Sequence, residues 1–473
     1  MQNRSVALNT KLENRKVVEK ILGPAVEDMS ISPQVVRKIA EGPVDEGFMR
    51  ALSELDKRSK TIASKSAPHT ELKALSDVKP LLTDLTNRAT ERIRDYIVAQ
   101  IKAIRSPSIN AQIIQQQAFS KYKDLYAFLA KHQPELASQI CQAYIYTMRW
   151  YYLNHFTRYK VSLERLKIHA LDRYDVLGED PSSKRTGTTL LGTARGGPPA
   201  SYDAFSLGRR IDTLKTTSVN ALPAHLAEEE KAAHYLETPF RSFNLALIDN
   251  ACFEYTFLTS YFSPSQTHHA IGRTFAAIFE PTFALGQALT KQLVENSTDT
   301  LGVLLCVRLN QHFAFELQRR KVPAVEGYIN ATNMLLWPRF QQILDLHCTT
   351  LQKLTNSLPT RPSTGATLLG AQSANSTAPT PLTQRFANLL QGILALSSEA
   401  GDDEPVSVSV SRLRSEYEAY LTRMSKGIPD ARKRERFLCN NYSLLCTILT
   451  DVDGRLGEDV KTHFEKLRDA FDD

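Results

Sequence analysis

The segment PELASQICQAYIYTMRWYYLNHFTRYKVSLERL, residues 134–166, decides the fold class of this chain. After Pro134 it holds neither glycine nor proline, and its apolar and aromatic residues recur every three or four positions. That spacing is typical of one face of a helix, and a proline followed by glutamate is typical of a first helical turn. The pattern predicts one continuous helix of roughly forty residues. At 1.5 Å per residue it would extend about 60 Å, twice the ~30 Å width of a small domain, which favours a rod.

The stretch around this segment is also free of glycine. No glycine occurs in the 130 residues between Gly47 and Gly178, where an average usage of about 7% would place roughly nine. Its few prolines are spaced as breaks between helices, because proline lacks the backbone donor that a helix interior needs. They are Pro68, Pro80, Pro107 and Pro134.

A second apolar stripe precedes the long predicted helix. Its members follow helical spacing, and charged residues occupy the other faces: Val78, Leu82, Leu85, Ala89, Ile93, Ile97, Ile101 and Ile104. The stripe is narrow and close to a coiled-coil seam. It packs either inside this chain or against helices of partner chains, and the pattern alone leaves both interpretations open.

Composition changes divide the chain into six predicted segments. They are N-terminal helices with an assembly coiled coil (1–110), a long helical rod segment (111–177), a low-complexity insert expected to be disordered (178–225), a helical bundle (226–355), a low-complexity linker (356–384) and a further helical segment (385–473). The predicted fold class is therefore all-α, with long N-terminal helices or a coiled coil followed by a rod of stacked helical bundles. A short alternation of valine and serine at residues 406–410 resembles a strand only weakly.

Overall composition narrows the class of protein. The 473 residues are 42% hydrophobic, and the net charge of +7 is a small difference between 58 basic and 51 acidic side chains. This balance gives no indication of a nucleic-acid partner. No window reaches the roughly 18 to 20 apolar residues of a membrane span, and the N-terminus lacks the apolar core of a secretory signal. The six cysteines have no close spacing and are expected to be reduced thiols in a cytosolic protein.

The sequence predicts no enzyme, no cofactor and no metal site. The pair His268-His269 has no matching acidic ligands, and Cys252 lies in an apolar helical pattern that favours a core thiol over a nucleophile. Asp451-Val-Asp453-Gly454 departs from the calcium-loop spacing and predicts a turn. The basic cluster at residues 432–436 is interrupted by Glu435, which favours a solvated helix face.

Several short motifs carry a resemblance to a known family. The stretch FRSFNLALIDNACFEYTF, residues 240–257, resembles a motif of the vacuolar protein sorting-associated protein 52 family. Further matching words follow the family's order along the chain: Leu12-Glu13-Asn14-Arg15-Lys16, Glu41-Gly42-Pro43-Val44, Leu55-Asp56-Lys57, Lys121-Tyr122, Tyr126-Ala127-Phe128-Leu129, Gly272-Arg273-Thr274, Val322-Pro323-Ala324, Leu336-Trp337-Pro338-Arg339-Phe340 and Phe437-Leu438-Cys439-Asn440-Asn441-Tyr442. The resemblance covers residues 11 to 449.

The resemblance implies a non-catalytic subunit of a heterotetrameric vesicle-tethering complex, with the helical-rod fold of multisubunit tethers. The implied complexes are the Golgi-associated retrograde protein complex and the endosome-associated recycling protein complex. Implied partners are vacuolar protein sorting-associated proteins 51 and 53, with 54 or syndetin as the fourth subunit, together with SNAREs and small GTPases of the Rab and Arf classes. The implied location is cytosolic, peripherally attached to trans-Golgi network and endosome membranes, and the implied pathways are retrograde transport to the Golgi and endocytic recycling.

We expect the helices before residue 105 to contribute to subunit assembly. The predicted partner interface consists of Leu81, Leu85, Ile93 and Ile97. Two alternatives share the composition: a subunit of another helical-rod tether such as the exocyst, and a coiled-coil scaffold or adaptor. Family members generally continue beyond the Asn440-Asn441-Tyr442 block and carry more helix before Leu12, so we expect this sequence to be short for its family or a partial gene model.

Overall fold

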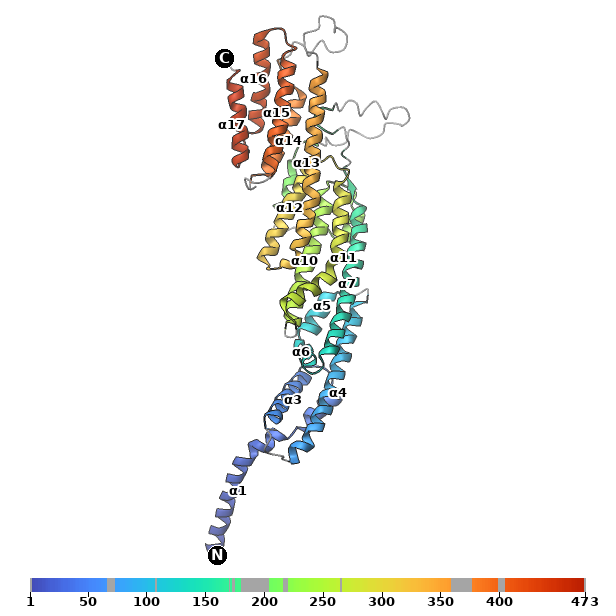
Figure 1. Ribbon diagram of the computed structural model, residues 1–473, viewed down its shortest axis with the longest axis vertical. Helices are drawn as coiled ribbons and strands as arrows, with labels where there is room; N and C mark the ends of the chain where they lie inside the picture. The colour runs from blue at the N-terminus through green and yellow to red at the C-terminus, as the bar shows by residue number, and fades with distance from the viewer. Residues whose placement is uncertain are drawn as a thin grey trace. The chain divides into compact units, whose positions relative to one another are not determined.

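A computed structural model describes residues 2–65, 73–106, 109–169, 171, 175–179, 204–215, 220–263, 266–358, 377–398 and 405–471. Its described residues are overwhelmingly helical (Figure 1). The sole β pairing among them is a parallel contact of two residues each, between β1 (Lys167–Ile168) and β2 (Ala233–His234). The all-α prediction is confirmed.

The chain divides into two compact units. Unit 1 comprises Met1–Asn154 and Phe253–Pro281, and unit 2 comprises His155–Cys252 and Thr282–Asp473. This division differs from the six predicted segments. Within the two predicted low-complexity segments, residues 180–203, 216–219 and 359–376 lie outside the described residues.

Unit 1 begins with the N-terminal helices and includes parts of three longer ones. Its elements are α1 (Gln2–Met29), α2 (Pro33–Ala40), α3 (Glu46–Lys65), α4 (Lys73–Ile104), α5 (Ala111–Ile114), the π-helix η1 (Gln115–Ser120), α6 (Lys123–His132), and the unit 1 portions of α7 (Pro134–Glu164), α10 (Glu237–Phe262) and α11 (His268–Val294). Helix α7 starts at Pro134 and ends at Glu164, so a continuous helix is confirmed, but its 31 residues are fewer than the roughly forty predicted.

The core of unit 1 is a cluster of aromatic rings. Phe119 packs edge-on against Tyr144 at 6.0 Å between ring centroids, and Tyr126 packs edge-on against Phe262 at 4.9 Å. Edge-to-face pairs at these separations add roughly 0.5 to 1.5 kcal/mol each beyond the burial of their area. These pairs therefore join η1 to α7, and α6 to the end of α10.

Unit 2 contains the remaining helices. Its elements are η2 (Gly208–Thr213, a 3-10 helix), α9 (Ala224–Glu229), α12 (Thr300–Arg319), η3 (Pro323–Val325), α13 (Glu326–Ser357), α14 (Pro381–Leu396), α15 (Val406–Ser425), α16 (Ala431–Ile448) and α17 (Arg455–Asp469), with the unit 2 portions of α7, α10 and α11. The valine and serine alternation at 406–410 forms the first turns of α15 rather than a strand.

Helix α12 lies at the centre of unit 2. Residues 301–307 are buried on every side of the helix, as expected for a central element packed by neighbours all round. It contacts α13 and α14, and Gly392 of α14 allows the close approach, because a Cβ there would lie 2.8 Å from a methyl carbon of Leu301. Farther along, the Phe386 and Tyr417 rings stack at 3.9 Å and join α14 to α15.

Candidate interaction surface on helix α1

The first helix exposes apolar side chains along most of its length. At about 100° per residue, one group falls within roughly 120° of the helix circumference and a second within roughly 60° on another side. The first group is Leu8, Leu12, Val18, Leu22 and Val26, and the second is Val6, Val17 and Ile21. All eight are at least half exposed, from 52% for Val18 to 70% for Ile21. We call these groups the broad stripe and the narrow stripe of α1.

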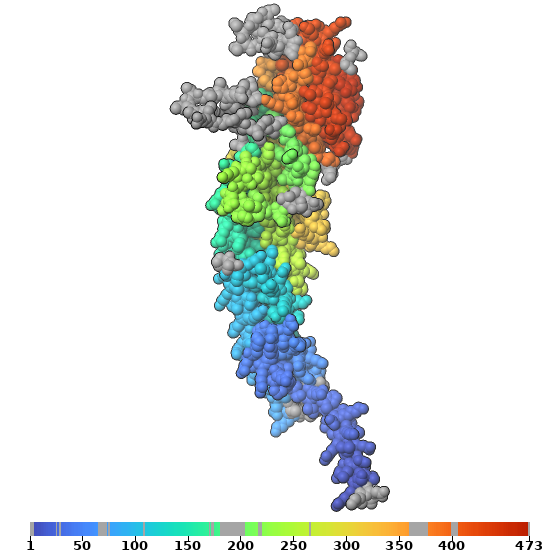
Figure 2. Space-filling view, turned by 180° about the vertical axis from the view of Figure 1, so that it is seen from behind, coloured from blue at the N-terminus to red at the C-terminus, as the bar shows by residue number. Residues whose placement is uncertain are grey.

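Helix α1 makes few contacts with its own unit. Among the described residues it touches α3 and α4, and the Arg58 guanidinium donates to the Glu27 carbonyl near its C-terminal end. Its N-terminal part extends beyond both helices, as an arm without neighbouring atoms in the space-filling view (Figures 1 and 2). Isolated helices are marginally stable in water, because tertiary packing of an apolar face supplies most helical stability in proteins. The two stripes therefore form a surface suited to partner helices.

Three of the four residues predicted as a partner interface are buried inside unit 1. Leu85, Ile93 and Ile97 are at most 5% exposed and pack within unit 1, on the face of α4 toward α2, α3 and α6. A partner helix cannot contact these side chains while unit 1 keeps this packing. Leu81 is 47% exposed and remains a candidate contact. Of the two interpretations that its pattern left open, the apolar stripe of α4 thus follows the first, which is packing inside this chain.

The stripes of α1 were missed as individual residues, although they lie inside the predicted assembly segment. Their signal is the spacing of four residues between Leu8 and Leu12, and again from Val18 to Leu22 and Val26. The second stripe on another side of the helix weakens the contrast between apolar and polar faces, which is the feature that identifies an amphipathic helix. A search for two apolar stripes would have found them.

Unit 1 buries a carboxylate in a fully polar network. Glu254 accepts hydrogen bonds from the Tyr144 hydroxyl at 2.7 Å, the Tyr152 hydroxyl at 2.9 Å and the Gln115 amide at 2.7 Å. Burial raises the pKa of Glu254, while the three donors lower it. Because Glu254 and Gln115 are completely buried, a substrate cannot reach them in the folded chain. The network joins η1, α7 and α10 and is structural.

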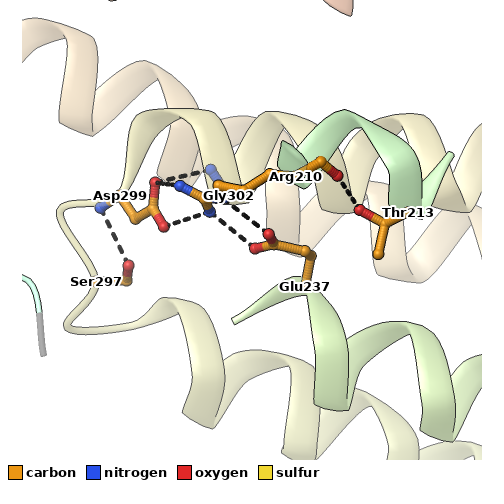
Figure 3. A network of polar contacts seen from close by, with 6 residues as sticks. All are labelled: Arg210, Thr213, Glu237, Ser297, Asp299 and Gly302. Atoms are coloured by element: carbon orange, nitrogen blue, oxygen red, sulfur yellow. Dashed lines mark hydrogen bonds and ion pairs between the residues drawn. The ribbon is translucent and has the colours of Figure 1, made fainter. Parts of the chain in front are cut away.

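Unit 2 contains a second buried network around one arginine (Figure 3). Arg210 of η2 donates to both oxygens of Glu237 at 2.8 Å, and to both oxygens of Asp299 at 2.6 and 3.2 Å. The three side chains are at most 4% exposed. Burial opposes the charge of Arg210, but the two carboxylates more than offset this effect and raise its pKa.

This network changes the expectation for residues 204–215, which sequence composition placed in the disordered insert. They contain η2, and its Arg210 is held between the N-terminal ends of α10 and α12. Asp299 also caps α12 by accepting from the Gly302 amide at 2.8 Å, and a Cβ at Gly302 would lie 2.5 Å from the Asp299 carboxylate. Local spacing does not indicate these pairs, because the partners are 27 and 89 residues apart.

The other residues considered for catalysis, metal binding or charge lie in ordinary structural positions. Cys252 is buried with a pKa raised by burial, and His268 and His269 are exposed at the start of α11. Asp451 lies in a turn and residues 452–454 form an irregular connection to α17, while most of the 432–436 cluster is exposed on α16. In the described ranges, no three His, Cys, Asp or Glu side chains gather as a metal would require, and no helix there is long and apolar enough to cross a bilayer.

Comparison with known proteins connects both units to one family. Residues 146–473 match the family model described as Vps52, C-terminal, and residues 1–129 match the model described as Vps52/Sac2 family, coiled-coil. The chain is 32% identical over 475 residues to vacuolar protein sorting-associated protein 52 of Schizosaccharomyces pombe, with 99% of this chain and 89% of the relative covered.

Relatives in plants and animals match over almost all of this chain but are longer. Identity is 30% over 467 residues to vacuolar protein sorting-associated protein 52 A of Arabidopsis thaliana, and 27% over 474 residues to the Homo sapiens homolog. Each alignment covers 99% of this chain and 62% of the relative, so the chain spans less than two thirds of their length. Since the C-terminal family model alone matches more than half of the residues, the chain belongs to the Vps52 family.

Proposed function

We propose that this chain is a non-catalytic subunit of a heterotetrameric vesicle-tethering complex that acts in retrograde transport from endosomes to the trans-Golgi network and in endocytic recycling. The observation that carries the proposal is the pair of exposed apolar stripes on α1, within the residues that match the family's coiled-coil model. The names of the relatives, which designate them as vacuolar protein sorting-associated proteins, support a role in protein sorting.

Two separate stripes on α1 suit a helix that packs between more than one partner helix. Burying a valine or leucine side chain contributes roughly 1.5 to 3 kcal/mol, so the eight side chains would supply on the order of 10 kcal/mol before the entropy of association is subtracted. In this proposal the partner helices come from vacuolar protein sorting-associated proteins 51 and 53, with 54 or syndetin as the fourth subunit. SNAREs and Rab-class or Arf-class GTPases bind the assembled complex, which associates peripherally with trans-Golgi network and endosome membranes.

Affinity purification of the tagged full-length chain from its own cells tests the proposal. We expect the double variant Leu12→Glu and Leu22→Glu, which places two charges on the broad stripe, to lose the sister subunits in quantitative mass spectrometry. The matched control is Ser5→Glu with Asn9→Glu, which adds the same charge at exposed polar positions of α1. Absence of the sister subunits from the wild-type purification would contradict the proposed complex.

Leu81 is tested in the same assay, because it is the predicted interface residue that stays exposed. A Leu81→Glu variant is expected to reduce recovery of the sister subunits without unfolding unit 1. The corresponding change at Ile93 would unfold unit 1, since Ile93 is completely buried. Full recovery with Leu81→Glu would limit the interface to α1.

A further inference from the structure

Two cavities adjoin on the surface of unit 2, beside the C-terminal end of η2. The first, of about 600 Å³, is lined by η2, α10 and α12, and the second, of about 430 Å³, is lined by η2, α12 and the end of α14. Leu214, Lys215 and His312 line both cavities, so the two form one continuous depression, which we call the η2 groove. Each cavity alone has the size of a typical small-ligand site, and the pair is far larger than one inorganic anion needs.

Apolar side chains form part of the groove lining. Leu245 of α10 and Leu309 and Phe313 of α12 line the first cavity. Phe315 lines the second cavity and is 69% exposed, which is high for a phenylalanine. Exposed aromatic side chains beside a concave surface are typical of places where apolar side chains of another chain dock.

The charged lining of the first cavity is predominantly basic. Its cationic side chains are Lys215, Arg241, Arg319 and Arg320, and its carboxylates are Asp249 and Glu316. With His312 neutral, the lining therefore has an excess of two positive charges. Arg241 and Asp249 belong to the stretch 240–257 that carries the family resemblance, and neither takes part in the buried networks described above. A groove with this balance favours an anionic occupant.

Two of the cations can turn toward a new carboxylate at small energetic expense. Arg319 pairs with Glu316 at 2.6 Å and Lys215 with Asp212 at 3.5 Å, but the arginine and lysine side chains are 71% and 69% exposed. Ion pairs as exposed as these contribute little to stability. Burial lowers the pKa of Arg241, so an additional anion beside it would stabilise its charged form.

We propose that the η2 groove binds an acidic, apolar peptide segment of a partner protein. Its carboxylates lie at Lys215, Arg241 and Arg319, and its apolar side chains pack on the exposed Phe315. A flat lipid surface fits a concave site poorly, and an excess of two charges is small compared with the six to ten phosphate contacts of a typical nucleic-acid site. The site lies in unit 2 and does not use the stripes of α1.

Fluorescence anisotropy with the full-length chain tests this proposal. The probe is a fluorescein-labelled ten-residue peptide in which glutamates alternate with leucine and phenylalanine. We expect saturable binding, weakened about tenfold by Lys215→Glu combined with Arg319→Glu, which corresponds to about 1.4 kcal/mol. Both residues are exposed, so the variant should fold, and an unchanged circular dichroism spectrum and melting temperature verify this.

The control variant is Arg432→Glu with Lys433→Glu, which reverses two exposed charges of α16 outside the groove. Unchanged affinity in this control supports the proposal, as does loss of binding when lysines replace the glutamates of the peptide. Equal weakening by both double variants would show non-specific attraction and overturn it. It would also be overturned if no saturable binding occurred at millimolar peptide, or if the groove variant weakened binding to phosphatidylserine vesicles while leaving peptide binding intact.

Discussion

Arg210 is the residue on which a large share of the polar packing in unit 2 depends. Replacing it with methionine would keep much of its volume but leave Glu237 and Asp299 buried without their cation. Breaking a buried ion pair in this way typically destabilises by about 3 to 5 kcal/mol. We therefore expect Arg210→Met to lower the free energy of unfolding by that amount, and Arg210→Lys to lower it less.

Urea unfolding followed by tryptophan fluorescence measures this change. The chain has two tryptophans, Trp150 in unit 1 and Trp337 in unit 2. A Trp150→Phe background therefore makes the signal report on unit 2. Arg432→Met, on the exposed face of α16, is the control and should change stability by less than about 0.5 kcal/mol. A similarly small effect of Arg210→Met would show that the buried network contributes little.

His347 makes the stability of unit 2 depend on pH. Its Nδ1 accepts from the Leu177 amide at 3.0 Å, its Nε2 lies 2.9 Å from the Thr300 hydroxyl, and burial lowers its pKa to about 3. Since the unfolded pKa is about 6.5, its contribution is complete above that pH and is lost as the pH falls toward 3. By about pH 5.5 the loss should reach about 1.4 kcal/mol.

The test compares unfolding free energies at about pH 7.5 and about pH 5.5 in the same fluorescence assay. We expect His347→Asn, which cannot titrate, to lose about 1.4 kcal/mol less than the wild type between these two values. The control His269→Asn removes an exposed histidine of α11 and should follow the wild type. Identical slopes for His347→Asn and wild type would refute the assignment.

These buried side chains mark the limit of prediction at the scale of residues. The burial of the Cys252 thiol was predicted correctly, because local apolar spacing decides it. The contacts of Glu254 and Arg210 could not be predicted, because they join residues up to 139 positions apart and depend on which helices become neighbours. The sequence alone does not distinguish a charged residue that is buried and paired from one that is exposed to solvent.

We expect helix α1 to contribute little to the folding stability of unit 1. Its residues 4–20 are exposed throughout, so deleting residues 2–20 removes almost no packed surface. We expect the deletion to leave the unfolding transition of unit 1 unchanged within about 0.5 kcal/mol, when Trp150 reports in a Trp337→Phe background. The same deletion should abolish recovery of the sister subunits. Loss of unit 1 stability would mean that α1 packs against its own chain.

Helix boundaries were more predictable than helix partners. Pro134 marks the start of α7 as expected, whereas Pro80 lies inside α4. The valine alternation at 406–410 is helical because Val406 and Val410, four residues apart, share the buried face of α15. The apolar spacing of α4 alone did not show whether this helix would pack against α2, α3 and α6 or against helices of partner chains. That choice depends on tertiary packing, which short-range spacing does not record.

At the scale of the whole molecule, the net charge of +7 hides two different kinds of surface. The stripes of α1 are apolar, and the η2 groove combines an apolar lining with an excess of basic side chains. Composition reports only their average, so the net charge by itself indicated neither surface. The all-α class was predictable because glycine, proline and apolar spacing act locally along the entire chain.

Salt distinguishes the two surfaces in one preparation of the full-length chain. The Debye length falls from about 10 Å at 0.1 M to about 3 Å at 1 M ionic strength, which screens exposed charges but not apolar contacts. We therefore expect recovery of the sister subunits to persist in about 1 M sodium chloride, because burial of the α1 stripes holds them. Affinity of the η2 groove for the acidic peptide should fall at least about tenfold over the same range, because exposed cations attract it. If subunit recovery instead fell as steeply as peptide binding, charged side chains rather than Leu12, Leu22 and their neighbours would hold the complex together.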